Sequence, residues 1–397
     1  MKSLKLLFIL LVLTGGLSAQ WVQVGAGTTT SQLWSVSFAD ASKVFAVGVN
    51  GTMVKSVDSG QNWSLVAHGL TTKNLYTIDF SSNLVGYAAG VGLTLLKTTD
   101  GGTTWTDIRS NLPTALLEYT ASSLDFYDIN FTDDNNGYAV GFNGVVIKTT
   151  DGGATWTNYS TIGSGTYRSS DFIDSNVGFL ASHGNNLKIT ENGGATFSVI
   201  SHGYTVTHFF DVQVVTPTVI IATGQPGIIL RSADAGVTWS KIATPNNTNV
   251  QLLNMVFVSS TTGYIIGQSG MLYKTTDAGA TWEQMTAGTA VALRGIDFKN
   301  GKGVAAGDGG VIVFYDSMTT ASPELLDNRL QIYPNPVKDI LHINADVKKL
   351  TVRDITGKVV LLSETQQNIN MAHLSKGIYL LQVQTADGIV EKKIMKE

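Results

Sequence analysis

The chain contains no cysteine, and only 14% of its 397 residues are charged. Without cysteine it cannot form disulfides, thiolate zinc sites, a cysteine nucleophile or a lipoprotein anchor. Its formal net charge of −4 provides no basic field for phosphates, so nucleic acid is not an expected partner. Glycine, by contrast, is abundant at 42 residues. This composition favours short strands joined by tight turns, and it predicts an all-β protein.

Apolar runs are short, and the most pronounced one lies at the start of the chain. Lys2 and Lys5 introduce an apolar run over residues 6–13, and small residues follow up to Ala19. This run is far shorter than the ~20 residues that span a bilayer. The pattern predicts a signal peptide over residues 1–19, cleaved before Gln20, and a mature protein without a transmembrane segment.

One eight-residue turn motif recurs six times in the body of the chain. Representative copies are SVDSGQNW, TTDGGTTW and TTDAGATW, and the copies are spaced by about 42 residues, with one longer interval of 51. This period is the length of a four-stranded propeller blade. The central acidic or amide residue of the turn falls at Asp58, Asp100, Asp151, Asn192, Asp234 and Asp277.

A seventh unit, from Leu293 onward, has three strand patterns but lacks the turn and its tryptophan. The segment WVQV, which begins at Trp21, matches the strands that follow the turn in the other copies. The sequence therefore predicts that the N-terminal strand completes the last blade and closes a seven-bladed β-propeller over residues 20–317. Closure would remove the exposed sheet edges that promote aggregation.

The repeated turn resembles the Asp-box, or bacterial neuraminidase repeat, and the whole unit resembles the photosystem II assembly and stability factor propellers. Asp-boxes occur in enzymes and in non-enzymes, so the motif indicates architecture and leaves activity open. The six turn residues are expected to be structural, because their side-chain oxygens can accept hydrogen bonds from the backbone N–H groups of the turn. Calcium binding is the lesser alternative, since no single turn collects the six or more oxygens that calcium prefers. The resemblance to the assembly factors implies a chaperone-like propeller that binds a peptide or a membrane-protein segment.

The C-terminal part of the chain differs from the repeats in its composition and in its pattern of apolar residues. A Pro/Ser/Thr linker is expected over residues 318–329, and alternating apolar and polar residues over 330–397 predict a small Ig-like β-sandwich. Its motifs YPNP, DITGKV, LSKGIY and KKI resemble the type A C-terminal sorting domain of the type IX secretion system. The resemblance implies that the type IX machinery is a partner. It also implies a Gram-negative bacterium of the Bacteroidota kind, and a protein that passes through the periplasm and is secreted or held at the outer-membrane surface.

The start of the first strand in each blade offers a candidate ligand site. Aligning the repeats places aromatic, apolar or arginine side chains there, and these should converge on one face of a propeller. Aromatic rings beside arginine stack on sugars or peptides and bind carboxylates, although the same side chains could simply plug the narrow end of the channel. The candidate ligand-binding residues are Trp34, Tyr76, Tyr127, Arg168, Phe210 and Arg294, with Leu253 at the seventh position.

Two further features are candidates for function. The same strands carry aspartates that would line the channel, where they could hold a cation, act as acids and bases, or form a hydrogen-bonded polar lining. An apolar insertion over residues 109–123 could contact a partner. The channel aspartates are Asp79, Asp128, Asp171, Asp211 and Asp297.

An enzyme is the alternative to a binding protein. Sialidases need three arginines, one of them on the first strand, where this chain has WSVSF without arginine. The propeller arginines are Arg109, Arg168, Arg231 and Arg294, and Arg231 occupies a repeat position filled by lysine elsewhere. The six histidines show no metal-ligand spacing. We therefore expect a non-catalytic secreted propeller that binds a glycan, peptide or protein, with no catalytic residues, metal or cofactor. The alternative is a secreted glycoside hydrolase of the sialidase-like or xyloglucan-cleaving kind.

Overall fold

The computed structural model describes residues 21–397 except 120–123, 162, 164, 247–248, 318–331, 345–346, 355–357, 364–367 and 385–388. The described chain forms two compact units, which divide between Tyr315 and Asp316. Both consist of β-strands, with one four-residue α-helix, α1 (Thr114–Leu117), in the first unit. The all-β prediction is confirmed. The predicted signal peptide and the predicted linker lie outside the described residues.

The first unit contains seven four-stranded antiparallel sheets within its described residues. Six of them run in chain order from the first strand to the fourth. The first three sheets contain β2 (Leu33–Phe38), β3 (Val44–Gly48), β4 (Met53–Ser56) and β5 (Ser64–Leu65); β6 (Leu75–Phe80), β7 (Gly86–Gly90), β8 (Leu95–Thr98) and β9 (Thr106–Asp107); and β10 (Phe126–Phe131), β11 (Gly137–Gly141), β12 (Val146–Thr149) and β13 (Thr157–Asn158). The next three contain β14 (Tyr167–Phe172), β15 (Gly178–Ser182), β16 (Asn186–Thr190) and β17 (Ser198–Val199); β18 (His208–Val214), β19 (Ile220–Gln225), β20 (Ile228–Ser232) and β21 (Ser240–Ile242); and β22 (Leu252–Phe257), β23 (Gly263–Gly267), β24 (Leu272–Thr275) and β25 (Glu283–Gln284). The seventh sheet combines β26 (Leu293–Lys299), β27 (Lys302–Gly307) and β28 (Ile312–Asp316) with β1 (Val22–Val24).

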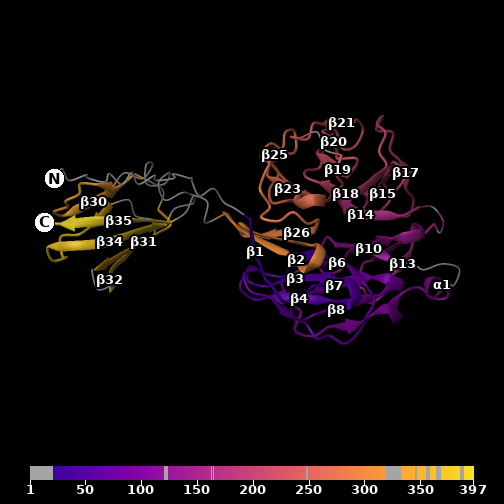
Figure 1. Cartoon of the computed structure of the whole chain (residues 1–397), viewed down its shortest axis with the longest axis horizontal. Helices are drawn as coiled ribbons and strands as arrows, with labels where there is room; N and C mark the ends of the chain where they lie inside the picture. Colours follow the sequence, from indigo (N-terminus) through magenta and orange to yellow (C-terminus); the bar gives the residue numbers. More distant parts are fainter. Residues whose placement is uncertain are drawn as a thin grey trace, which may run out of the picture. The chain divides into compact units, whose positions relative to one another are not determined.

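The first strands of successive sheets contact one another, and β26 contacts β2, so these strands form a closed ring around a central axis (Figure 1). The second strands are continuous runs of small and apolar residues, such as GYAVG in β11, and every residue of that strand is buried. A strand covered on both faces by neighbouring sheets has this pattern. Glycine ends β11 because a Cβ on Gly141 would lie 1.8 Å from the backbone oxygen of Asp125.

Ring closure occurs at the seventh sheet. Strand β1 pairs antiparallel with β28, with Val22 opposite Phe314 and Val24 opposite Ile312. The indole of Trp21 is 1% exposed. Its ring centroid lies 5.2 Å from that of Tyr315 and 5.6 Å from that of Phe298. The prediction that the N-terminal strand completes the last sheet is confirmed.

The six repeated turns share one hydrogen-bonding pattern. In the second copy, Asp100 accepts hydrogen bonds from the backbone N–H of Thr104 at 2.8 Å and from the Thr98 hydroxyl at 2.8 Å. Hydrogen bonds from the backbone and the side chain of Thr104 lower the pKa of Asp100 to about 2. Asn192 replaces the acid in the fourth copy and still accepts from the backbone N–H of Thr196. These hydrogen bonds explain the acidic or amide residue of each turn by a structural role within that turn.

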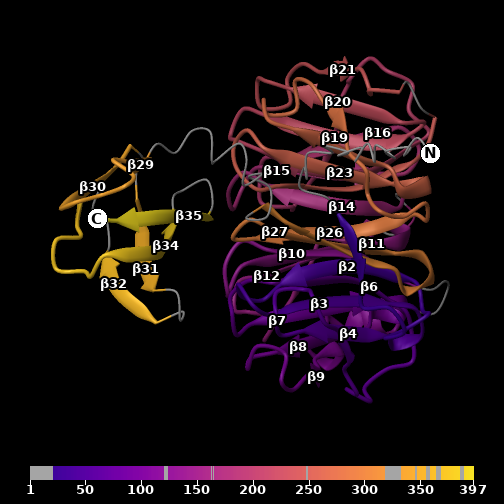
Figure 2. The ribbon, with the colours of Figure 1, turned by 60° about the vertical axis from the view of Figure 1, so that its left-hand side comes forward.

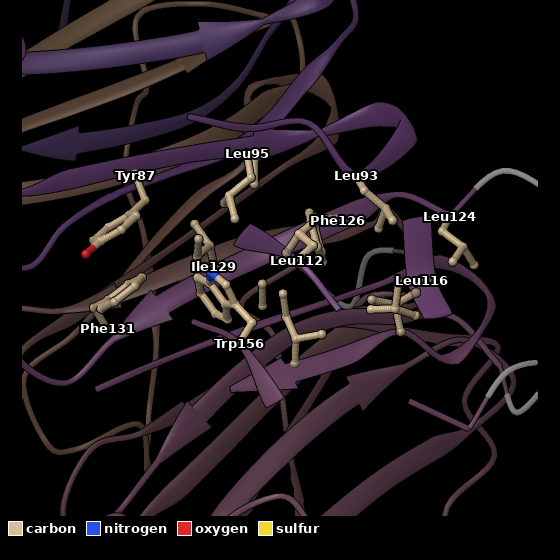
Figure 3. Close-up of a cluster of buried hydrophobic side chains, with 14 residues drawn as sticks. Tyr87, Leu93, Leu95, Leu112, Leu116, Leu124, Phe126, Ile129, Phe131 and Trp156 are labelled. Atoms are coloured by element: carbon tan, nitrogen blue, oxygen red, sulfur yellow. The ribbon is translucent and has the colours of Figure 1, made fainter. Parts of the chain in front are cut away.

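The insertion over residues 109–123 packs onto the propeller, as far as the structure describes it. It contains a 3-10 turn, η3 (Arg109–Asn111), and helix α1. Leu112 and Leu116 are buried in one apolar cluster with Phe126 and Trp156 (Figure 3). These two leucines face inward and are not available to a partner, whereas a partner contact by the rest of the insertion stays a prediction. Burial of the insertion against its own blade removes more apolar surface from water than exposure would.

The second unit has two sheets over one core. One sheet contains β29 (Ile332–Tyr333), β30 (Ile340–Ile343) and β33 (Asn368–Asn370). The other has the order β32 (Val359–Ser363), β31 (Lys349–Asp354), β34 (Gly377–Gln384) and β35 (Ile389–Lys396) (Figure 2). Leu341 and Ile369 of the first sheet share an apolar cluster with Val352, Leu381 and Ile394 of the second. Two sheets that bury their facing side chains in this way form a β-sandwich.

Among the described residues, no helix is long and apolar enough to cross a membrane.

Candidate functional site

A cavity of about 400 Å³ lies where the first strands of the propeller converge. Its wall contains side chains from β2, β6, β10, β14, β18 and β26, together with residues of β22. The structure brings all six candidate residues to this one cavity, and Leu253 joins them at the seventh repeat position. The candidates lining it are Trp34, Tyr76, Tyr127, Arg168, Phe210 and Arg294.

Three aromatic side chains, which we call the aromatic arc (Trp34, Tyr76 and Tyr127), form a continuous part of the cavity wall. The rings of Trp34 and Tyr76 have centroids 5.4 Å apart and meet edge to face at 88°. The Tyr76 and Tyr127 rings follow at 5.1 Å with a tilt of 55°. Rings at such angles leave apolar faces and edges toward the cavity, which suits stacking with aromatic, aliphatic or sugar groups.

A guanidinium group ends the aromatic arc on each side. The Cζ atom of Arg168 lies 4.2 Å from the centroid of Tyr127, and that of Arg294 lies 4.4 Å from the centroid of Trp34. Both distances are within the range of cation–π attraction, which fixes the two side chains against the arc. In the cavity wall, the three aromatic rings therefore lie between two guanidinium groups.

The two arginines have different polar partners within their own sheets. Arg294 Nε donates to Asp308 Oδ1 at 2.6 Å in an ion pair. Arg168 Nε donates to His183 Nε2 at 2.8 Å. Burial, followed by the charge of Arg168, lowers the pKa of His183 to about 4, so this ring is neutral at neutral pH and can accept the bond.

The partners His183 and Asp308 were not identified from the sequence, although a signal existed. Each directly follows the second strand of its sheet, at the position that Val49 and Val91 occupy in other blades. In the sequence an ionisable residue occupies this position only in the two blades that have an arginine at the start of the first strand, and this coincidence would have suggested the pairing. His208, whose ring centroid lies 4.3 Å from that of His183, is a further neighbour that sequence reasoning missed.

The channel aspartates join neighbouring sheets. Asp79 accepts a hydrogen bond from the backbone N–H of Phe131 at 2.9 Å, and Asp297 accepts one from Phe38 at 2.7 Å, across the closure of the ring. The other three make the same kind of bond to the next sheet: Asp128 to Ser170, Asp171 to Val214 and Asp211 to Met255. Of the interpretations open from the sequence, these bonds favour a hydrogen-bonded lining. No group of three metal-ligating side chains occurs among the described residues.

Burial raises the pKa of all five channel aspartates, to about 7 for Asp79, Asp171 and Asp211. Asp211 is 3% exposed, and desolvation by burial is the largest cause of the raised pKa in all five. A carboxyl group whose pKa is higher in the folded state stabilises the fold below its unfolded pKa, and this contribution is lost as pH rises through the folded pKa. For these groups the loss begins near the unfolded pKa of 3.8, continues up to the folded pKa of about 7, and is complete by about pH 8.

We therefore predict that the melting temperature of the propeller rises when the pH is lowered from 8 to 6.5. Asp211→Asn should reduce this rise by about a third, a change of roughly 1 °C, because one of three groups with a pKa near 7 no longer titrates. An asparagine can keep the bonds to Ser169 and Met255 that Asp211 makes. Calorimetry at the two pH values measures the effect.

The matched control for this experiment is Asp277→Asn, since Asn192 shows that the turn accepts an amide. Asp277 has a lowered pKa and does not titrate in this window. The pH range stops at 6.5 because His183 destabilises the fold below that value. If the wild type melts at the same temperature at both pH values, the aspartate account is wrong.

Comparison with known proteins agrees with this architecture. The family model for the photosynthesis system II assembly factor YCF48 matches residues 14–121, 115–170 and 244–349, which together exceed half of the chain. The model for the secretion system C-terminal sorting domain matches residues 331–397. No curated protein matches the sequence.

Solved structures show the same fold at low identity. A structure described as YCF48 bound to D1 peptide is 22% identical with a TM-score of 0.63, and the match covers 76% of this chain and 97% of that chain. YCF48 from Cyanidioschyzon merolae is 19% identical with a TM-score of 0.60, covering 75% and 99%.

A third similar structure is PorZ, a surface component of the type IX secretion system of Porphyromonas gingivalis. It is 12% identical with a TM-score of 0.56, and the match covers 91% of this chain but 59% of PorZ. The C-terminal domain implies export through the type IX system. The propeller repeats, the ring of sheets and the family match together show that the chain belongs to the YCF48 photosynthesis system II assembly factor family.

Proposed function

We propose that this protein is an exported, non-catalytic binding propeller that captures a peptide segment of a partner protein in the cavity at the aromatic arc. The observation that carries the proposal is the convergence of three aromatic rings and two guanidinium groups on one cavity of about 400 Å³. Rigid aromatic side chains give large contact area at low entropic cost, and arginine adds directional hydrogen bonds.

The similar proteins support a peptide as the ligand. A YCF48 propeller of the same fold has been solved with a D1 peptide bound, as its description states. The sorting domain supports delivery through the periplasm to the medium or to the outer-membrane surface, where the type IX machinery is the export partner. A photosynthetic partner is not part of the proposal, because the sorting domain directs the propeller out of the cell.

The absence of catalysis is supported by how the channel carboxylates are used. A general acid or base must reach a proton of the substrate. Asp171 accepts backbone hydrogen bonds on both oxygens, from Phe172 at 2.8 Å and from Val214 at 2.7 Å. Asp211 is likewise bonded through both oxygens, to Ser169 and Met255. Groups committed to holding the ring together are poorly placed to exchange protons with a ligand.

The proposal predicts the effect of removing rings from the aromatic arc. Tyr127→Ala or Tyr76→Ala should weaken binding of a selected peptide by about fivefold or more, because a stacking aromatic contributes ~1 kcal/mol. Tyr127→Phe keeps the ring and should bind like the wild type. The measurement is a peptide-library selection on the mature full-length chain, followed by calorimetric titration of each variant.

Val199→Ala is the control, since this side chain is 62% exposed on the outer strand β17 and lies outside the cavity. Each variant is first melted to confirm that it is folded. The same preparations are incubated with a panel of polysaccharides and sialosides. Release of product from any of them would contradict the non-catalytic proposal, and a glycan that binds more tightly than every peptide would contradict the choice of ligand.

A further inference from the structure

Among the residues that the structure describes, the cavity contains one cation without an anionic partner, Arg168. The salt bridges among the described residues are Lys43 with Asp40 and Arg294 with Asp308, and neither involves Arg168. The propeller segments that the structure leaves undescribed, residues 120–123, 162, 164 and 247–248, contain no aspartate or glutamate. An unpaired guanidinium beside low-dielectric aromatic rings has lost part of its hydration, which an incoming anion would offset.

The contacts of Arg168 define which part of its guanidinium is available. One face is stacked on Tyr127, with Cζ 4.2 Å from the ring centroid, and Nε is used by His183. Within the described residues the terminal nitrogens Nη1 and Nη2 make no hydrogen bond. The edge formed by these two nitrogens matches the two oxygens of a carboxylate.

Arg294 shows how an arginine at this repeat position is arranged when a carboxylate is paired with it. It lies at the corresponding repeat position of the last sheet and is stacked on Trp34 at 4.4 Å. Here the residue after the second strand is an acid, and Asp308 bonds Arg294 through both oxygens, Nε to Oδ1 at 2.6 Å and Nη2 to Oδ2 at 3.5 Å. In the Arg168 sheet the corresponding residue is the neutral His183, which supplies no negative charge.

We propose that Arg168 is a subsite for one carboxylate group of the bound peptide, and that Asp308 blocks a second such subsite at Arg294. The inference rests on the proposed function, because it specifies the chemistry of the ligand at the same cavity. It predicts that the cavity selects a segment with one acidic group next to apolar or aromatic groups that reach the aromatic arc.

The test uses a pair of probes of the same shape, N-acetylphenylalanine and its uncharged amide, titrated onto the mature full-length chain by ligand-observed NMR. We expect the acid to bind about tenfold more tightly than the amide, as for a bond between charged groups. Arg168→Gln should reduce binding of the acid to the level of the amide, and Arg168→Lys should restore part of it. Asp308→Asn should raise the number of acid molecules bound from one to two.

Equal binding of acid and amide, no binding of the acid, or an unchanged affinity in a folded Arg168→Gln variant would overturn the subsite. Glucuronate in a parallel titration tests the origin of the carboxylate, and tighter binding of glucuronate than of the acid would overturn its assignment to a peptide. The two proposals fail separately. If no peptide of the library binds, the proposed function is wrong. The difference in binding between the acid and the amide, and its dependence on Arg168, are measured without the library and test the subsite alone.

Discussion

Removal of residues 21–24 is expected to lower the melting temperature of the propeller by about 10 °C or more. The deletion removes β1, leaves β28 as an open edge and empties the space of Trp21, which is 1% exposed. Truncation of a buried tryptophan alone costs roughly 3–5 kcal/mol, and each kcal/mol lowers the melting temperature by about 2–4 °C at this size. Differential scanning calorimetry on the mature chain and on the deletion variant measures the change.

Two point variants separate packing from strand pairing. Trp21→Ala keeps the backbone of β1 but removes the ring that stacks on Tyr315, and it should account for most of the loss. Val22→Ala changes a side chain that is 48% exposed in the same strand and should have almost no effect. If the deletion variant melted at the wild-type temperature, closure of the ring by the N-terminal strand would not stabilise the fold.

Deletion of residues 332–397 should abolish export and leave the propeller in the periplasm. The reason is that the match to the secretion system sorting domain covers this unit, and the first unit contains no similar match. The measurement is an immunoblot of periplasm, cell surface and medium from the producing bacterium. The purified deletion protein should melt like the full chain in its propeller transition, which shows that retention is not a folding defect.

Leu381→Asp tests whether the folded sandwich, and not only its motifs, is needed for export. Leu381 is fully buried in the core that the two sheets share, and a charge there should unfold the unit. The adjacent Leu380 is 42% exposed, so Leu380→Asp should leave the sandwich folded. Secretion of the deletion protein at the wild-type level would contradict a sorting function for the tail.

The parts that the sequence predicts well depend on repetition. Six copies of one turn fix the register of the blades, and this register alone brings Trp34, Tyr76 and Tyr127 to equivalent positions in successive blades. The exchange of the N-terminal strand follows from the same count, since the last repeat lacks one strand and the propeller begins with one. Regular repeats can be aligned by their spacing, so distant residues are placed together reliably.

The parts that the sequence did not predict depend on contacts between side chains and backbone. The sequence left open whether the channel carboxylates hold a cation, act as acids and bases or form a hydrogen-bonded lining. The bond from the backbone of Phe131 to Asp79 favours the lining, and such a contact leaves no mark in the sequence. The insertion looked like an exposed apolar loop, but Leu112 and Leu116 turn inward. The partners of the two arginines, His183 and Asp308, differ between blades, and a pattern based on similarity between repeats overlooks such differences.

The most direct test of the central claim is to locate a ligand at the aromatic arc. A photoreactive benzoylphenylalanine at position 76 or 127 of the secreted protein should crosslink to a peptide segment of one partner protein in the native culture, and unlabelled peptide from the library should compete for the crosslink. The same substitution at Val199, outside the cavity, should give none. Equal crosslinking at Val199, or a partner that remains bound after Tyr76→Ala and Tyr127→Ala are combined, would contradict binding at the arc.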